Sequence, residues 1–169
     1  GLPVYLTVTA LRNKNKTVTG FLGMAMDISQ QKQDRINLQS LTEHLNKAII
    51  VAELGTWSWH LQDNKHVWND RMKEMYSVPA DASPDSYHVY WYSSIHPEDL
   101  ADAVNAIQRA IEGLEPFNYT FRVVKADGSI RYMNTAGLLE MGSDDKPSTM
   151  SGFNRDITKQ LENETSLQD

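Results

Sequence analysis

Residues 117–157, FNYTFRVVKADGSIRYMNTAGLLEMGSDDKPSTMSGFNRDI, contain the pattern that decides the fold. Apolar and polar side chains alternate along residues 117–123, which is the period of a strand with one buried face. Asp127-Gly128 is a strong tight-turn signal, and a return strand follows whose alternating positions are Ile130, Tyr132, Asn134, Ala136 and Leu138. Residues 150–157 form a third strand. Consecutive strands joined by tight turns predict an antiparallel sheet.

The segment before these strands predicts a long helix. His96-Pro97-Glu98-Asp99-Leu100 is a helix start, because proline suits the first helical position and acids in the first turn favour the helix dipole. Apolar residues then recur at helical spacing and make one stripe, which must lie on a sheet: Leu100, Val104, Ile107, Ile111 and Leu114. Gly113 and Pro116 end the helix.

A short hairpin opens the same domain. Residues 55–61 alternate large and small side chains, residues 62–65 form a turn, and residues 66–68 resume the sheet. Asn69 or Asp70 then caps a short helix that carries Met72, Met75 and Tyr76 and stops at Pro79. The aromatic stretch 87–95 has no assignable period. This order of strands, helices and strands predicts an α+β fold, with the helices over one face of the sheet.

The chain contains an internal repeat. Gly23-Met24-Ala25-Met26-Asp27-Ile28-Ser29 resembles Gly152-Phe153-Asn154-Arg155-Asp156-Ile157-Thr158, and Gly152 lies 129 positions after Gly23. The strand at 4–7 matches 131–134, where Arg131 lies 127 positions after Val4. Residues 1–30 therefore read as the last hairpin of a preceding domain of the same kind. Because the chain begins inside a strand and without Met, we expect it to be a segment of a longer protein.

A connecting helix is predicted between the two copies. No Gly or Pro interrupts residues 30–52, and an apolar seam recurs at spacings of three and four: Leu38, Leu41, Leu45, Ala48 and Ala52. Two interpretations stay open, an amphipathic helix on its own domain and a two-chain coiled coil. The predicted division is a leading hairpin at 1–30, a linker helix at 31–52, the complete domain at 53–158 and an outgoing helix at 159–169.

Composition excludes several classes of function. The net charge is -6, without a run of Lys or Arg, which argues against a nucleic-acid surface. There is no cysteine, so disulfides, thiolate metal sites and a thiol-adduct flavin photocycle are excluded. No apolar stretch approaches the length of a membrane span, and we expect a cytoplasmic location without membrane contact in this segment. The five histidines show no metal-ligand spacing, and no nucleophile, phosphate loop or catalytic carboxylate pair is recognisable, so we predict no metal site and no enzyme activity.

Residues 47–160 resemble the PAS sensor domains, in the subgroup of PAS/PAC repeats that end in Asp-Ile-Thr. The motifs that carry the resemblance are Gly55-x-Trp57-x-Trp59, Trp68-Asn69, Ile95-His96-Pro97-Glu98-Asp99, Phe121-Arg122-Val123, Asp127-Gly128 with Arg131, Gly152 and Asp156-Ile157-Thr158. Tyr132 stands where such domains often carry Trp. The resemblance implies a five-stranded antiparallel sheet with helices over one face, often enclosing a small-molecule pocket, in bacterial multidomain signalling proteins.

Two groups of residues are candidates for function. Signal transmission is assigned to Trp57, Trp59, Asp156, Ile157 and Thr158, because the acid and threonine can fix the exit from strand to helix. The second group is either a packed core or a ligand pocket: Trp68, Met72, Met75, Tyr76, Ile107, Phe121 and Tyr132. A haem held by a His or Met donor such as Met72, Met75 or His88 stays open.

Three hypotheses for function follow. The first is a sensory and transmission module that relays ligand or partner state to a C-terminal effector, a histidine kinase or a cyclic-di-GMP enzyme. The second is a ligand-free module that dimerises through the linker helix, with Leu38, Leu41, Leu45 and Ala48 as the seam. The third is a haem or flavin sensor. The sequence identifies no cofactor or ligand.

Overall fold

The computed structural model describes residues 1–166 and divides the chain into two compact units. The first unit is Gly1–Ala48, and the second begins at Ile49. The first unit contains β1 (Val4–Arg12), β2 (Val18–Asp27) and most of α1 (Ser29–Val51). The elements of the second unit are β3 (Gly55–His60), β4 (Lys65–Trp68), α2 (Asp70–Met75), the 3₁₀ turn η1 (Pro84–Ser86), α3 (Tyr87–Ser94), α4 (Pro97–Ile111), β5 (Phe117–Val124), β6 (Ile130–Met141), β7 (Pro147–Asp156) and α5 (Thr158–Ser166). The predicted end of the outgoing helix, 167–169, lies outside the described residues.

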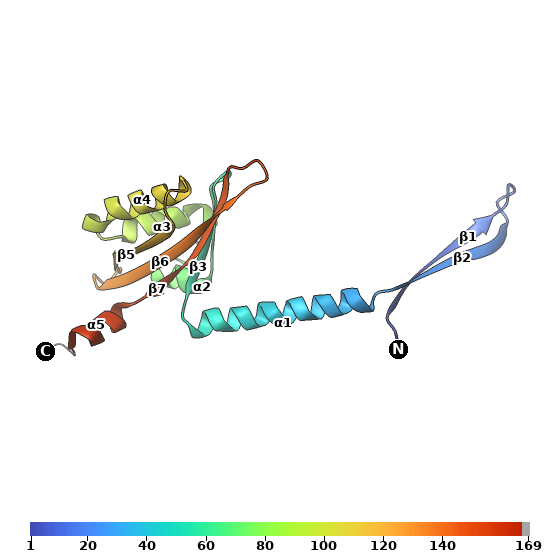
Figure 1. Cartoon of the computed structure of the whole chain (residues 1–169), viewed down its shortest axis with the longest axis horizontal. Coiled ribbons are helices and arrows are strands. Elements are labelled where there is room, and N and C mark those ends of the chain that lie inside the picture. The colour runs from blue at the N-terminus through green and yellow to red at the C-terminus, as the bar shows by residue number, and fades with distance from the viewer. Residues whose placement is uncertain (167–169) are drawn as a thin grey trace. The chain divides into compact units, whose positions relative to one another are not determined.

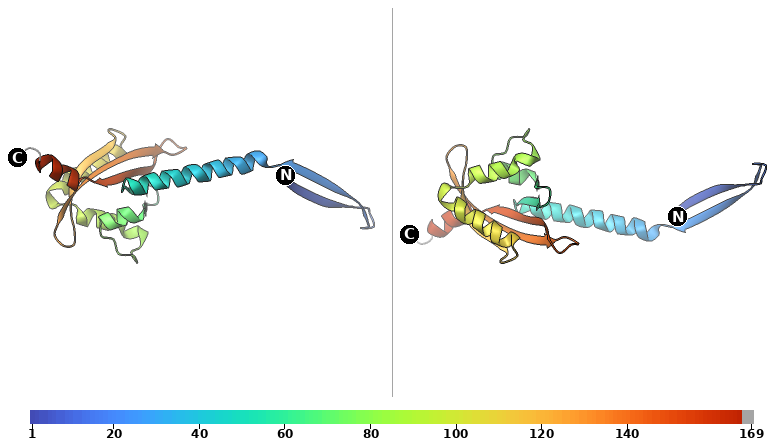
Figure 2. Two further views of the ribbon diagram at one scale, coloured as in Figure 1. Left: turned by 90° about the horizontal axis from the view of Figure 1, so that it is seen from below. Right: turned by 90° about the horizontal axis from the view of Figure 1, so that it is seen from above.

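The second unit is built on a five-stranded antiparallel sheet with the strand order β4-β3-β7-β6-β5. Helices α2, α3 and α4 cover one face of this sheet (Figures 1 and 2). The core lies between the two layers, and its most deeply buried side chains include Tyr76, Phe121, Met133 and Met150. The predicted α+β class, with helices over one face of an antiparallel sheet, is confirmed.

The predicted buried face of β6 was wrong by one residue. Phe121 pairs with Met133, and Arg122 pairs with Tyr132. Directly paired residues in an antiparallel sheet point to the same side, so Met133 shares the core face with Phe121. Tyr132 therefore lies on the outer face and is 38% exposed. Leu138 lies on the same face and is 73% exposed. The alternation of apolar side chains in the return strand favoured the wrong face, and pairing across the turn fixes the right one.

Side-chain caps fix where helices α2 and α4 begin, and an ion pair holds the start of α4 against the sheet. Asn69 caps α2, because its Oδ1 accepts from the N–H of Met72 at 2.8 Å. His96 caps α4, whose first turn carries Asp99. The guanidinium of Arg122 on β5 donates to both Asp99 carboxylate oxygens, at 2.6 and 3.0 Å, and holds the pKa of that carboxyl at about 2. This pair ties the start of α4 to the sheet.

Two helical predictions change. The aromatic stretch without assignable period forms helix α3, which carries the buried Tyr87. Leu114, predicted in the apolar stripe of the long helix, lies beyond the end of α4 and is 60% exposed. Gly113, at φ +72°, has already turned the chain, and Ala103 and Ala110 are the buried residues of α4.

The hairpin of the first unit repeats the pairing at the end of the β6–β7 hairpin, with the same difference in residue number for both strands. Val4 pairs with Asp27, as Met133 pairs with Asp156, so both strands of the hairpin match β6 and β7 at 129 positions. The offset of 127 predicted for the strand at 4–7 was therefore wrong, because backbone pairing sets the register. The assignment of this hairpin to a preceding domain, and the predicted domain boundaries, stay predictions.

Helix α1 leaves its apolar seam uncovered. It has no buried residue, and Leu38, Leu41 and Leu45 are 57–65% exposed. Ala48 is exposed as well.

Candidate functional site

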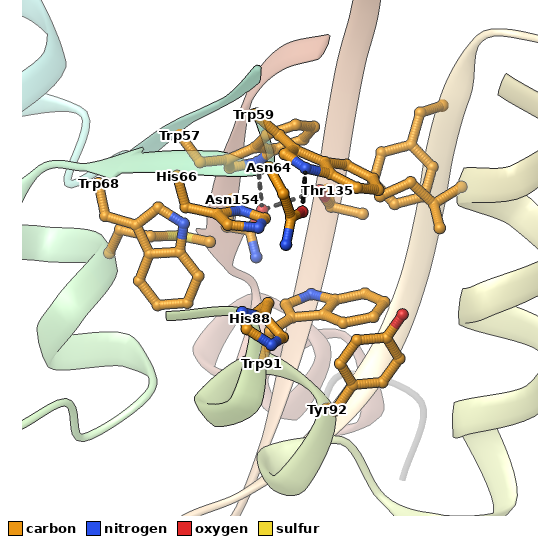
Figure 3. Close-up of a pocket in the computed structure, with 13 residues that line it drawn as sticks. Trp57, Trp59, Asn64, His66, Trp68, His88, Trp91, Tyr92, Thr135 and Asn154 are labelled. Carbon is orange, nitrogen blue, oxygen red and sulfur yellow. Dashed lines mark hydrogen bonds between the residues drawn. The ribbon is translucent and has the colours of Figure 1, made fainter. Parts of the chain in front are cut away.

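A cavity of about 250 Å³ lies between the sheet and helix α3. Trp59 and His66 project from the sheet, while His88, Trp91 and Tyr92 project from α3 on the opposite side (Figure 3). The cavity is lined by Trp57, Trp59, Asn64, His66, Trp68, Met72, His88, Trp91, Tyr92, Ile107, Phe117, Thr135 and Asn154. Aromatic rings dominate this lining, and among residues 1–166 no Asp, Glu, Lys or Arg belongs to it.

The polar floor of the cavity is centred on Asn154 of β7. Its Oδ1 accepts from Trp57 Nε1 at 2.9 Å and from Thr135 Oγ1 at 2.8 Å (Figure 3), and its Nδ2 donates to the Tyr76 hydroxyl at 2.6 Å. Burial raises the pKa of Tyr76, so this phenol stays neutral. One amide therefore joins β3, β6, β7 and the residue after α2 beneath the cavity.

Two glycines make room for the Trp57 indole above this floor. Gly137 of β6 and Gly152 of β7 are paired across the sheet. A Cβ at Gly137 would lie 2.8 Å from Trp57 Cη2, and a Cβ at Gly152 would lie 2.6 Å from Trp57 Cζ2. Both positions therefore require glycine for the indole to reach Asn154.

An aromatic stack forms one wall of the cavity. The ring centroids of Trp59 and His66 are 5.4 Å apart with an interplanar angle of 15°, and those of His66 and His88 are 5.6 Å apart at 27°. Nε2 of His66 and Nδ1 of His88 are buried without a hydrogen-bond partner. Burial, with a smaller effect of His88, lowers the pKa of His66 to about 4, so His66 is a neutral imidazole at pH 7.

The predicted pocket residues divide into three groups. Trp68, Met72 and Ile107 line the cavity. Met75, Tyr76 and Phe121 are buried in the core but do not line it. Tyr132 is placed on the outer face of β6 and contributes to neither, because of the register described above.

Several lining residues were missed by sequence reasoning. Trp57 and Trp59, predicted for transmission, line the cavity as well. The sequence places Asn154 inside the repeat motif, where a polar residue two positions before the terminal Asp is the signal that could have found it. Trp91 and Tyr92 belong to a stretch whose sequence shows no helical period, so no signal identifies them. The sequence predicts His88 as a possible metal or haem donor, not as part of an aromatic wall.

The volume of the cavity bears on the haem and flavin hypothesis. Small-molecule pockets in proteins measure roughly 300–1,000 Å³, and this cavity, at about 250 Å³, is smaller than that range. Met72 and His88, two of the donors considered for haem iron, line the cavity, whereas Met75 does not. Within residues 1–166, no group of three or more His, Asp or Glu side chains is placed to hold a metal ion.

The exit from sheet to helix is fixed by the predicted Asp-Ile-Thr residues. Asp156 Oδ1 accepts from the N–H of Thr158 at 3.0 Å and from its hydroxyl at 2.6 Å. The N–H of Tyr132 donates to Thr158 Oγ1 at 2.9 Å, and the N–H of Ile157 donates to the Tyr132 carbonyl at 2.9 Å. Thr158 is buried and begins α5. The first turn of α5 is thus attached to the end of β7 and to β6.

Comparison with known proteins agrees with this architecture. A family model described as PAS fold matches residues 65–154. The chain is 30% identical over 154 residues to the probable diguanylate cyclase DgcE of Escherichia coli (strain K12), an alignment that covers 91% of this chain and 14% of that protein. The chain thus spans about one seventh of the length of this curated relative.

No helix in the part of the chain that the structure describes is long and apolar enough to cross a membrane.

Solved structures share the fold at lower identity. A sensory box histidine kinase/response regulator from Burkholderia thailandensis E264 superposes with a TM-score of 0.60 and 23% identity, covering 73% of this chain and 92% of that one. The N-terminal domain of a diguanylate cyclase with PAS/PAC sensor from Marinobacter aquaeolei gives 0.54 and 16%, covering 64% and 98%.

Proposed function

The chain belongs to the PAS fold family, and on this premise we propose that it is a sensory and signal-transmission module. The observation that carries the proposal is the position of β7. This strand supplies Asn154 to the floor of the cavity and, two residues later, Asp156 to the exit into α5. Because only one residue of β7 separates Asn154 from Asp156, a displacement of Asn154 can be passed along the strand to the first turn of α5.

The relay proposed here is a shift between two arrangements of the Asn154 bonds. A ligand can move such an equilibrium only by binding one arrangement more tightly than the other. Occupancy that displaces the Trp57 or Tyr76 partner would alter the end of β7, where Asp156 holds Thr158. The module itself regulates, and the reaction belongs to another domain.

The whole protein is proposed to carry a C-terminal effector in the same chain. The curated relative is named a probable diguanylate cyclase, which favours a cyclase of this kind, and a histidine kinase is the alternative.

The transmission step can be tested by replacing Asp156 with alanine in the full-length protein. We expect regulation of the effector to be lost while the domain stays folded, because only the bonds to Thr158 disappear. Asp127→Ala is a matched control, since Asp127 Oδ1 accepts from the N–H and hydroxyl of Ser129 at 2.9 and 2.6 Å in a hairpin loop away from the exit. Unchanged regulation in Asp156→Ala would refute the relay.

A second candidate function is dimerisation through α1. The exposed Leu38, Leu41 and Leu45 support it, because an apolar seam without a partner favours association. We expect a homodimer in sedimentation experiments and a monomer after Leu41→Glu. Val51→Glu, on the same helix outside the seam and 84% exposed, should leave the dimer intact.

A further inference from the structure

The walls of the cavity define the chemistry of what it can hold. Its volume of about 250 Å³ lies just below the roughly 300–1,000 Å³ of pockets that hold drug-sized ligands, which favours a smaller occupant. Indole and phenyl side chains from both layers face the space (Figure 3). Flat aromatic surfaces stack best against other flat rings, with offset or edge contacts. A mono- or bicyclic planar molecule fits this size and these walls.

The charge of the occupant is restricted by the same walls. The lining contains no ionised acid or base, and His66 is neutral at pH 7. Moving an ion into such a site would cost its solvation without a counter-charge in return. The walls therefore favour a neutral occupant.

The two imidazoles provide the polar contact. Nε2 of His66 and Nδ1 of His88 are buried and have no hydrogen-bond partner, although nearly all buried polar atoms in folded proteins have one. Part of the polar lining is already engaged, since the Asn154 Oδ1 accepts two hydrogen bonds and Asn64 Oδ1 accepts from Trp59 Nε1 at 2.8 Å. Among residues 1–166, the two imidazole nitrogens are the buried polar atoms of this lining that have no hydrogen-bond partner.

We propose that the cavity binds a small, neutral, planar aromatic molecule whose N–H or O–H group hydrogen-bonds the His66–His88 pair. This inference rests on the proposed sensory function and names the class of ligand that the cavity senses. The stacked Trp59, His66 and His88 rings form the recognition wall.

Calorimetric titration of the 169-residue chain with three probes tests the proposal. Indole has the ring and the N–H group, naphthalene has the ring alone, and benzoate has the ring with a negative charge. We expect indole to bind about tenfold more tightly than naphthalene, the effect of one hydrogen bond, and benzoate not to bind. His66→Phe keeps the stacking surface and removes the nitrogens, so the preference for indole should disappear while naphthalene still binds.

The control variant is His60→Phe, at an exposed position of β3 that does not line the cavity, and it should retain the preference. Failure of all three probes to bind would overturn the proposal, as would benzoate or naphthalene binding as tightly as indole. A preference for indole that survives both His66→Phe and His88→Phe would overturn it too. Indole binding without any change in hydrogen exchange of α5 would instead contradict the relay and leave the ligand class standing.

Discussion

Replacing Asn154 with alanine should remove a large part of the stability of the domain. Three groups lose their hydrogen-bond partner: the Trp57 N–H, the Thr135 hydroxyl and the Tyr76 hydroxyl. These residues are 8%, 1% and 2% exposed. A buried polar group left without a partner costs about 1–3 kcal/mol, and water from the adjoining cavity can satisfy part of this demand. We therefore expect a loss of about 3–4 kcal/mol, against a total stability of roughly 5–15 kcal/mol for a typical domain.

Urea unfolding followed by tryptophan fluorescence measures this loss for the relevant unit, since Trp57, Trp59, Trp68 and Trp91 all lie in it. Asn134→Ala is the matched control. Its Nδ2 donates to Thr120 Oγ1 at 3.1 Å on the outer face of the sheet, where water can replace the bond, so we expect a change below about 1 kcal/mol.

The reasoning would be refuted by a loss in Asn154→Ala no larger than that in Asn134→Ala. Tyr76→Phe removes one partner only, and its expected loss is about 1–2 kcal/mol. This milder variant keeps the measurement possible if Asn154→Ala does not fold.

Three further predictions use the same unfolding measurement. Gly152→Ala should lose about 3 kcal/mol or not fold, because its Cβ would lie 2.1 Å from the Ala136 carbonyl oxygen. The control Gly142→Ala should lose less than about 1 kcal/mol, because the tightest contact of its Cβ, at 3.0 Å, is with the end of the Asp144 side chain. The free energy of unfolding should fall by about 1 kcal/mol as pH decreases from 6.5 to 4. The reason is that His66 in the unfolded chain binds a proton in this range, whereas folded His66, with its pKa lowered to about 4, does not; the magnitude is reduced because the ring is partly exposed. An equally steep dependence of the free energy of unfolding on pH in His66→Phe would contradict this. Asp99→Asn should lower the free energy of unfolding by about 2 kcal/mol by weakening the pair with Arg122. Since the pKa of Asp99 is lowered to about 2, the stabilisation by this ion pair should be present above pH 3.8 and disappear as pH falls toward 2. The control Asp102→Asn, exposed on the same helix, should change the free energy of unfolding little at neutral or at acidic pH.

The elements with local signals were predictable from the sequence. The Asp127-Gly128 turn and the His96 helix start depend on interactions within a few residues, and both are present in the structure. The face of β6 was not predictable from its own pattern, because Tyr132 and Met133 are both compatible with burial. Only the pairing of Phe121 with Met133 across the turn decides between them.

The cavity was only partly predictable, for a related physical reason. Trp68 and Met72 were found because large apolar residues near a short helix are usually buried. His66 and His88 come from a strand and a helix that meet only through tertiary packing, and the fold leaves their nitrogens without partners. Neither spacing nor composition contains that information.

The two copies of the exit show which of its bonds accompany both helix starts. In both copies the Asp side chain accepts from the N–H two residues later, at 2.8 Å for Asp27 and 3.0 Å for Asp156. The N–H of the following Ile donates to the carbonyl of the partner strand, Pro3 in one copy and Tyr132 in the other, at 3.0 and 2.9 Å.

One bond is not shared between the copies. Tyr132 donates its N–H to the Thr158 hydroxyl, but Pro3 has no N–H to donate to Ser29. Since α1 begins at Ser29 without that bond, the hydroxyl contact is not needed to start the helix, whereas the Asp contact is common to both. The hydroxyl contact instead attaches the first turn of α5 to β6, the strand that also supplies Thr135 to the cavity floor. Thr158→Val should therefore leave α5 helical and weaken its response to the cavity, while Asp156→Ala should disturb the start of the helix itself.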